Sequence, residues 1–196
     1  MFIGSFDVAA ESNLSSAALP FQELTLRWII LILGILILIL VTIALAGAML
    51  PQEHTVTRSI LLKQSPETIW AVITDHANEP KWRTDVESVT RLADRNGHEL
   101  VEEKYKKGDT MKIETVESQP PTRLVRDVVD NPIFSGRWTY ELTPENGGTR
   151  VSITEHGSVP NPVFRLVSRF VIGHTTSIDK FLTALAGKFG EKADIR

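Results

Sequence analysis

The chain has 196 residues, a formal net charge of −3 and no cysteine, and it is long enough for one domain with a core besides a membrane segment. From His54 onward it carries 20 basic and 20 acidic residues, since only Arg27 and four acidic residues come earlier. This neutral balance lacks the basic surface of nucleic-acid-binding proteins, and the missing cysteine excludes disulfides, thiolate catalysis and cysteine-ligated metals.

Residues 1–27 are rich in Ser and Ala, and we expect a mostly disordered tail there. Residues 28–50, WIILILGILILILVTIALAGAML, contain no charge over 23 positions. As a helix this stretch would be about 34 Å long, against a hydrocarbon core of about 30 Å. The sequence therefore predicts a transmembrane helix, with Trp28 and Arg27 at one membrane surface.

A cleaved signal peptide is the alternative, because Ala44, Ala46 and Ala48 could form a cleavage site. The apolar run is too long for a signal-peptide core, which favours a retained single-pass anchor in a bacterial cell membrane. The flanking charges do not decide which side the following domain faces: Arg27 precedes the span, and Arg58 and Lys63 follow it.

After Pro51 the pattern predicts a strand over residues 54–64 and a helix that begins with Ser65 as N-cap and Pro66. A period of two then predicts six strands, separated by Gly, Asn and Pro turns, over residues 86–92, 99–106, 110–117, 124–130, 136–143 and 149–156. A final amphipathic helix is predicted from Asn161-Pro162 to about Phe189.

This order of elements predicts an α+β fold in which a curved antiparallel sheet packs on one long C-terminal helix. A sheet that wraps around a helix leaves space between the two layers, where small ligands bind. Gly173 lies inside the predicted helix and weakens it, so we expect a close strand or a slight kink there.

Residues 54–191 resemble the SRPBCC or START-like superfamily, also called the polyketide cyclase/dehydrase and lipid-transport family. The resemblance rests on the segments SPETIWAVITD, PKWRTDVESV, QPPTRLV, GRWTYELTPENGGTRVSITEHG and NPVFRLVSRFVIGHTTSIDKFLTALAGKFGE. It also rests on a membrane span that ends in Leu-Pro-x-Glu-His, as residues 50–54 do here. It implies a helix-grip fold with a hydrophobic cavity, but no particular reaction.

Period counting places a carboxylate and an imidazole on facing inner surfaces, Glu155 on the last strand and His174 on the helix. We expect these two side chains to lie close together in an apolar cavity. The expected lining residues are Met111, Ile113, Trp138, Tyr140, Val151, Ile153, Glu155, Val167, Phe170, Val171 and His174. Trp70 and Trp82 are expected to pack rather than to contact ligand.

Three functions stay open. The first is membrane-anchored binding or transport of a hydrophobic small molecule or lipid. The second is a cyclase or aromatase in which His174 moves a proton and Glu155 orients it. The third is an accessory domain that docks a membrane partner. A purely structural role of the two residues is favoured over catalysis, with Glu155 paired to Arg165 or Arg169, because buried charges are normally paired wherever they occur. The five histidines show no metal-ligand spacing, so we expect no metal and no cofactor.

Overall fold

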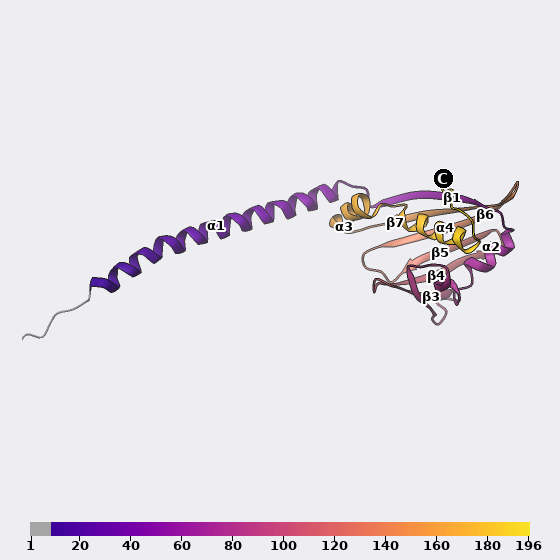
Figure 1. The fold of residues 1–196 in the computed structure, drawn as a ribbon, viewed down its shortest axis with the longest axis horizontal. Helices are drawn as coiled ribbons and strands as arrows, with labels where there is room; N and C mark the ends of the chain where they lie inside the picture. The colour runs from indigo at the N-terminus through magenta and orange to yellow at the C-terminus, as the bar shows by residue number, and fades with distance from the viewer. Residues whose placement is uncertain (1–8) are drawn as a thin grey trace, which may run out of the picture. The chain divides into compact units, whose positions relative to one another are not determined.

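The computed structural model describes the backbone of residues 9–196 and the side chains of residues 25–196. It divides into two compact units, residues 1–46 and 47–196. Helix α1 (Ala9–Ala48) accounts for the described part of the first unit, and its segment Thr25–Ala48 is long and apolar enough to cross a membrane (Figure 1).

The expected disordered tail differs from the structure, because residues 9–27 continue α1 toward the N-terminus. Ala and Leu, four of each, are the commonest residues in this stretch and have high helix propensities. The part of the expected tail before Ala9 lies outside the described residues. At its other end α1 stops at Ala48, shortly before Pro51, which has no backbone N–H to continue a helix.

The second unit contains one seven-stranded antiparallel sheet. Its strands are β1 (Glu53–Leu62), β2 (Val86–Arg91), β3 (Glu99–Tyr105), β4 (Thr110–Gln119), β5 (Arg123–Val129), β6 (Ser135–Glu145) and β7 (Gly148–Ser158). The strand order is β1-β7-β6-β5-β4-β3-β2, so β2 to β7 form a meander and β1 is added beside β7. All seven predicted strands are confirmed.

Two helical segments follow β1 before the meander. Helix α2 (Pro66–Ile73) begins as predicted, with the Ser65 hydroxyl accepting a hydrogen bond from the Thr68 amide. A short 3₁₀ turn, η1 (Glu79–Lys81), comes next and ends at Trp82. Buried Ile69 and Ile73 attach α2 to the hydrophobic core.

The sheet curves around helix α4 (Thr176–Lys188), which confirms the helix-grip fold (Figure 1). The core between these two layers consists of aliphatic side chains that are at most 2% exposed: Ile60 and Leu62 on β1, Leu142 on β6, Val151 and Ile153 on β7, and Ile178, Leu182 and Leu185 on α4. Burying each of these side chains contributes about 1.5–3 kcal/mol, so this contact fixes the position of α4.

The prediction of one continuous helix up to Phe189 was wrong. The segment forms helix α3 (Pro162–Val167), a single π-helical turn η2 (Ser168–Ile172) and then α4. Gly173 separates η2 from α4 with a φ of 81° and a ψ of 134°, a backbone conformation that is accessible almost only to glycine. A full break therefore replaces the slight kink expected at this glycine.

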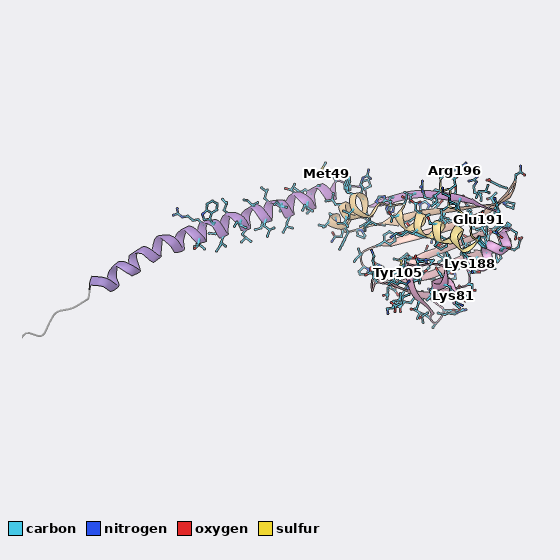
Figure 2. All side chains as sticks on the ribbon, in the orientation of Figure 1. Met49, Lys81, Tyr105, Lys188, Glu191 and Arg196 are labelled. Carbon is cyan, nitrogen blue, oxygen red and sulfur yellow. The ribbon has the colours of Figure 1, made fainter. Side chains whose placement is uncertain are left out.

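The C-terminal residues cover the free edge of β1. Ser59 and Arg196 exchange two backbone hydrogen bonds of 2.9 Å, and the Lys63 amide donates to the carboxylate of Glu191. Glu191 and Arg196 are labelled in Figure 2. An uncovered edge strand can pair with another chain, and this tail prevents such pairing along part of β1.

Candidate functional site

Four of the expected cavity residues lie on the inner face of β6 and β7. Tyr140, Val151 and Ile153 are buried in the core, and Trp138 is partly buried beside Tyr140, with 6.1 Å between the ring centroids. Their alternation with outward residues follows the period of two used in the prediction. These side chains pack in the hydrophobic core and do not line an open cavity.

The other expected lining residues lie elsewhere. Val167, Phe170 and Val171 are 36%, 70% and 77% exposed, so their placement in the cavity was wrong. The break at Gly173 turns α3 and η2 out of the line of α4, and the apolar stripe counted through the break loses its common direction. Met111 and Ile113 are partly buried on β4, directly opposite Glu103 and Val101 of β3, so they share the inner face of the sheet but lie three strands away from β7.

Glu155 and His174 are connected through a third residue, His54, at the start of β1. The Nε2–H of His54 donates to Glu155 Oε1 at 3.0 Å, and the His54 and His174 rings stack with 3.8 Å between their centroids. No direct hydrogen bond joins Glu155 to His174 among the described contacts. The expected alternative partners, Arg165 and Arg169, do not pair with Glu155 either.

The sheet register explains why His54 occupies this position. His54 is directly opposite Gly157, and Glu155 is opposite Val56, so His54 and Glu155 are diagonal neighbours on the inner face. A Cβ atom on Gly157 would collide with the His54 ring. The glycine of the EHG sequence thus provides the space in which the imidazole reaches the carboxylate.

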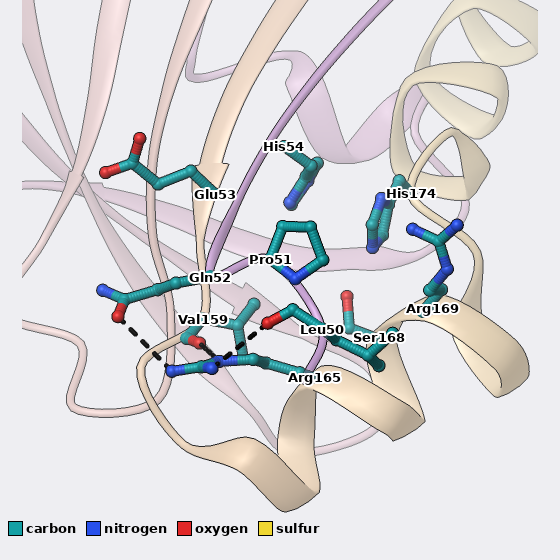
Figure 3. Close-up of a pocket in the computed structure, with 10 residues that line it drawn as sticks. All are labelled: Leu50, Pro51, Gln52, Glu53, His54, Val159, Arg165, Ser168, Arg169 and His174. Atoms are coloured by element: carbon teal, nitrogen blue, oxygen red, sulfur yellow. Dashed lines mark hydrogen bonds between the residues drawn. The ribbon is translucent and has the colours of Figure 1, made fainter. Parts of the chain in front are cut away.

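The two rings border a small pocket at the end of the sheet where β1 begins (Figure 3). Its volume is about 40 Å³, enough for two or three water molecules, whereas pockets for drug-sized ligands occupy about 300–1,000 Å³. The lining residues are Leu50, Pro51, Gln52, Glu53, His54, Val159, Arg165, Ser168, Arg169 and His174. His174 is the one expected cavity residue among them.

The electrostatics of this pocket favour a neutral His174. Burial lowers the pKa of His174, and the nearby imidazole of His54 and guanidinium of Arg169 lower it further. A neutral imidazole at pH 7 can accept a proton from a bound molecule. Glu155, only 5% exposed, provides a negative charge next to His54.

Aromatic rings fill the interior between α4 and the middle of the sheet. Phe181 of α4 is in edge contact with Trp82 at 5.4 Å and with Tyr140 at 5.5 Å between centroids. Burial raises the pKa of Tyr140 to about 12, so its hydroxyl stays protonated. Trp82 packs against Phe181, in agreement with the packing role expected for it. The Nε1 atom of its ring has no hydrogen-bond partner among the described residues.

Charged side chains surround these rings on the side of η1 and β3. Arg83 Nη1 donates to Glu79 Oε1 at 2.6 Å and to Glu103 Oε2 at 3.1 Å, and the hydroxyl of Tyr105 donates to Glu103 Oε2 at 2.6 Å. Both carboxylates are 2% exposed. Burial by itself would lower the pKa of Arg83, but Glu103, Tyr105 and Glu79 hold it above its usual range.

Arg126 on β5 extends this cluster toward α2. Its Nη2 donates to the Ile73 carbonyl at 3.0 Å and to His76 Nε2 at 3.3 Å, and its guanidinium carbon lies 5.7 Å from the centroid of the Tyr140 ring. Arg126 is 5% exposed. Together, Trp82, Arg83, Arg126, Tyr140 and Phe181 form a group that we call the interior cluster.

Three nitrogen atoms of the interior cluster have no acceptor in the part of the chain that the structure describes: Trp82 Nε1, Arg83 Nε and Arg126 Nε. A buried donor without a partner costs about 1–3 kcal/mol, so such groups are rare in folded proteins. Trp82 and Arg83 contact the Phe181 ring and Arg126 contacts the Tyr140 ring, so the three unpaired donors belong to neighbouring side chains of the interior.

The sequence analysis missed the charged members of this site. Glu103 is two residues after Val101 on β3, and Arg126 is two residues after Leu124 on β5. Residues two apart on a strand share a face, so the period of two could have placed both charges on the inner face. Within the described residues, no group of three or more His, Cys, Asp or Glu side chains is arranged to hold a metal ion.

Comparison with solved structures shows the same fold in proteins of low sequence identity. The aromatase/cyclase Zhui from Streptomyces sp. R1128 has a TM-score of 0.60 at 13% identity, covering 69% of this chain and 93% of its own. A START superfamily protein from Mycobacterium smegmatis has a TM-score of 0.54 at 17% identity, covering 69% and 96%. A conserved protein from Geobacillus kaustophilus has a TM-score of 0.58 at 18% identity, covering 73% and 99%.

A comparison with curated proteins gave no significant match. The family model for polyketide cyclase/dehydrase and lipid transport proteins matches residues 53–190, which is β1 to the end of α4. This match includes the whole sheet, the interior cluster and the histidine pair. The chain therefore belongs to the polyketide cyclase/dehydrase and lipid transport family.

Proposed function

We propose that the domain binds an amphipathic small molecule, with a hydrophobic body and oxygen acceptors, at the interior cluster while α1 anchors it in a membrane. The observation that carries the proposal is the set of unpaired donors on Trp82, Arg83 and Arg126. A carboxylate or carbonyl oxygen would satisfy these donors, and the aromatic rings would contact the apolar part of the ligand.

The ligand needs a rearrangement to enter, because side chains fill the space between α4 and the sheet. Trp82 is the best candidate for movement. It follows the short η1 turn, and its ring has no hydrogen bond to break. Its edge contact with Phe181 is worth about 0.5–1.5 kcal/mol, which a bound ligand can replace.

The membrane anchor is part of the same proposal. The segment Thr25–Ala48 would keep the domain next to the bilayer, where hydrophobic molecules are concentrated. Lipids and other hydrophobic molecules are therefore the proposed partners, and the family description, which includes lipid transport, agrees with this choice.

Binding of a defined probe to the full chain in nanodiscs tests the proposal. The probe is 2-naphthoate, a water-soluble aromatic carboxylate, and empty nanodiscs provide its background partitioning. We expect saturable binding that weakens about tenfold or more in Arg126→Met, because a charge-assisted hydrogen bond contributes about 1.5–3 kcal/mol. Arg91→Met, at an exposed surface pair, is the matched control and should bind like the wild type. Equal affinities in all three proteins, or no saturable binding, would exclude the interior cluster as the site.

Acid–base catalysis of the cyclase or aromatase kind is a second candidate, favoured by the arrangement of Glu155, His54 and His174. A neutral His174 at the pocket could abstract a proton next to a carbonyl, while the Glu155–His54 pair stabilises the resulting positive charge. In this reading His54, rather than His174, is the residue that Glu155 orients.

Deuterium exchange at the α-carbon of a 3-oxo thioester measures this activity directly. If the pocket is catalytic, the full chain accelerates exchange above the buffer rate, and His174→Gln and His54→Gln abolish the acceleration. His156→Gln changes an exposed histidine of β7 and should retain it. Exchange at the buffer rate with the wild-type chain would eliminate the catalytic reading and leave the binding proposal intact.

A further inference from the structure

The outer surface of α3 and η2 is strongly apolar. Phe170, Val171 and Ile172 are 70%, 77% and 56% exposed, and the remaining apolar members are Val163, Phe164 and Val167, each at least 36% exposed. We call these six residues the α3–η2 face. Soluble domains rarely leave such a contiguous group uncovered, and its presence indicates an interaction surface.

The face is held rigidly against the residues that precede β1. Arg165 donates to the carbonyls of Val159 at 2.8 Å and Leu50 at 3.3 Å, and to the side-chain oxygen of Gln52 at 3.3 Å (Figure 3). The backbone of Pro162 approaches Gly47 so closely that a Cβ atom on this glycine would collide with it. The α3–η2 face therefore has a fixed position relative to residues 47–52.

Those residues follow directly on the apolar segment Thr25–Ala48. If this segment crosses a bilayer, as the proposed function assumes, residues 47–50 must lie where the span leaves the hydrocarbon. Met49, which is 87% exposed, belongs to the same junction. The α3–η2 face, which the hydrogen bond from Arg165 to Leu50 connects to this junction, is then near the membrane surface.

From this connection we infer that the α3–η2 face inserts into the same bilayer that holds α1, as an interfacial helical segment. We favour the bilayer as the partner of this face because residues 47–52 connect the face to the membrane span. The covalent chain and the Arg165 contacts bring the face to the bilayer, and no further molecule is needed. The guanidinium of Arg169 lies 5.9 Å from the Phe170 ring, where it can reach lipid phosphates while the ring enters the acyl region. Insertion at this end of the sheet would also bring the pocket lined by His54 and His174 to the headgroup region.

Site-directed spin labelling tests the inference in the full chain, because the sequence has no cysteine and a single introduced thiol is the only labelling site. The label is placed at Val171→Cys and, in a separate protein, at Phe170→Cys. The matched control is Asn146→Cys. Asn146 is exposed in the β6–β7 hairpin, and this hairpin is at the end of the sheet opposite to the first residues of β1. Each protein is reconstituted in vesicles of phosphatidylcholine and phosphatidylglycerol.

The readout is the ratio of collisions with oxygen, which concentrates in the bilayer, to collisions with a water-soluble nickel complex. We expect this ratio to be higher at residues 170 and 171 than at residue 146, because oxygen concentrates in the bilayer while the nickel complex stays in water. A ratio at residues 170 and 171 equal to that at residue 146 would overturn the inference. Labels shielded from both reagents would also overturn it, and dilution with unlabelled chain would then separate contact with a second copy from contact with another protein.

Flotation of the vesicles after carbonate washing separates this inference from the assumption on which it depends. Protein that floats while its label at residue 171 stays water-accessible disproves the docking of the face but keeps the anchor. Protein that does not float disproves the anchor, and the inference with it.

Discussion

The imidazole rings of His54 and His174 stack with 3.8 Å between their centroids, although one residue opens the sheet and the other lies in the break before the last helix. His54 is also bonded to Glu155, so a buried carboxylate and two imidazoles form one continuous row. The row depends on the antiparallel pairing of β1 with β7, which places His54 diagonally opposite Glu155.

Burial of His174, together with the nearby imidazole of His54 and guanidinium of Arg169, makes the stability of the domain sensitive to pH. The pKa of His174 is below its usual value in the folded state, so the unfolded chain binds more protons as the pH falls through about 6.5. Unfolding is then favoured at lower pH. We expect the melting temperature of the full chain to fall between pH 7.5 and pH 5.5 and to fall less in His174→Phe, which keeps a ring at this position. His156→Gln is the control, and an equal pH dependence in His174→Phe and wild type would contradict the prediction.

The buried charges around Arg83 predict a large loss of stability when the cation is removed. Arg83→Met would leave Glu103 with the Tyr105 hydroxyl and Glu79 with His76 as their remaining side-chain partners, and breaking buried ion pairs in this way costs about 3–5 kcal/mol. Arg91→Met removes an arginine of which 63% is exposed and should change the free energy of unfolding little, because exposed ion pairs contribute little to stability. Urea unfolding of both variants, monitored by circular dichroism, measures the difference. Similar midpoints would show that the carboxylates are stabilised by other contacts.

The two parts of the C-terminal apolar stripe should respond differently to truncation. Leu182 of α4 is fully buried, so Leu182→Ala should destabilise the domain by about 2–5 kcal/mol through the lost burial and the cavity that remains. Val171 is 77% exposed, and Val171→Ala should change the free energy of unfolding by less than about 0.5 kcal/mol. Thermal unfolding of the two variants in detergent compares them. A large effect at Val171 in detergent would mean that this side chain is covered by protein.

The break at Gly173 can be tested against a glycine inside α4. A side chain at Gly173 is strained by the positive φ, and Gly173→Ala should destabilise the domain by about 1–3 kcal/mol. Gly187 has helical neighbours on both sides and open space around its Cα, so Gly187→Ala should stabilise the domain by up to about 1 kcal/mol. Opposite signs of the two shifts in unfolding midpoint are expected. A stabilising Gly173→Ala would indicate a continuous helix in solution.

Local patterns were sufficient to predict the strands and the start of α2. The alternation along β6 and β7 requires only the period of two, and the Ser65 cap requires only neighbouring residues. The inner positions of Tyr140, Val151 and Ile153 followed from the same alternation. Such signals are short in range, and this is why they could be read without knowing the fold.

The last helix shows where local patterns mislead. Apolar residues recur at helical spacing on both sides of Gly173, and the count cannot detect that a positive φ changes the direction of the chain. Phe170 and Val171 were therefore expected inside and are exposed, while Ile178 and Leu182, which follow the break at helical spacing, are buried. The functional consequence is large, because the exposed half becomes a candidate membrane surface instead of a cavity wall.

The amino-acid sequence by itself determined the class of the fold, the apolar span and the presence of an inward Glu155, because each depends on residues that are near one another in the chain. Only the tertiary structure decided the partners. Register across β1 and β7 brought His54 to Glu155, and the packing of the chain after η1 against β3 brought Arg83 to Glu103. Contacts between distant segments depend on how the strands pair and where the chain turns, and no single segment of the sequence contains that information.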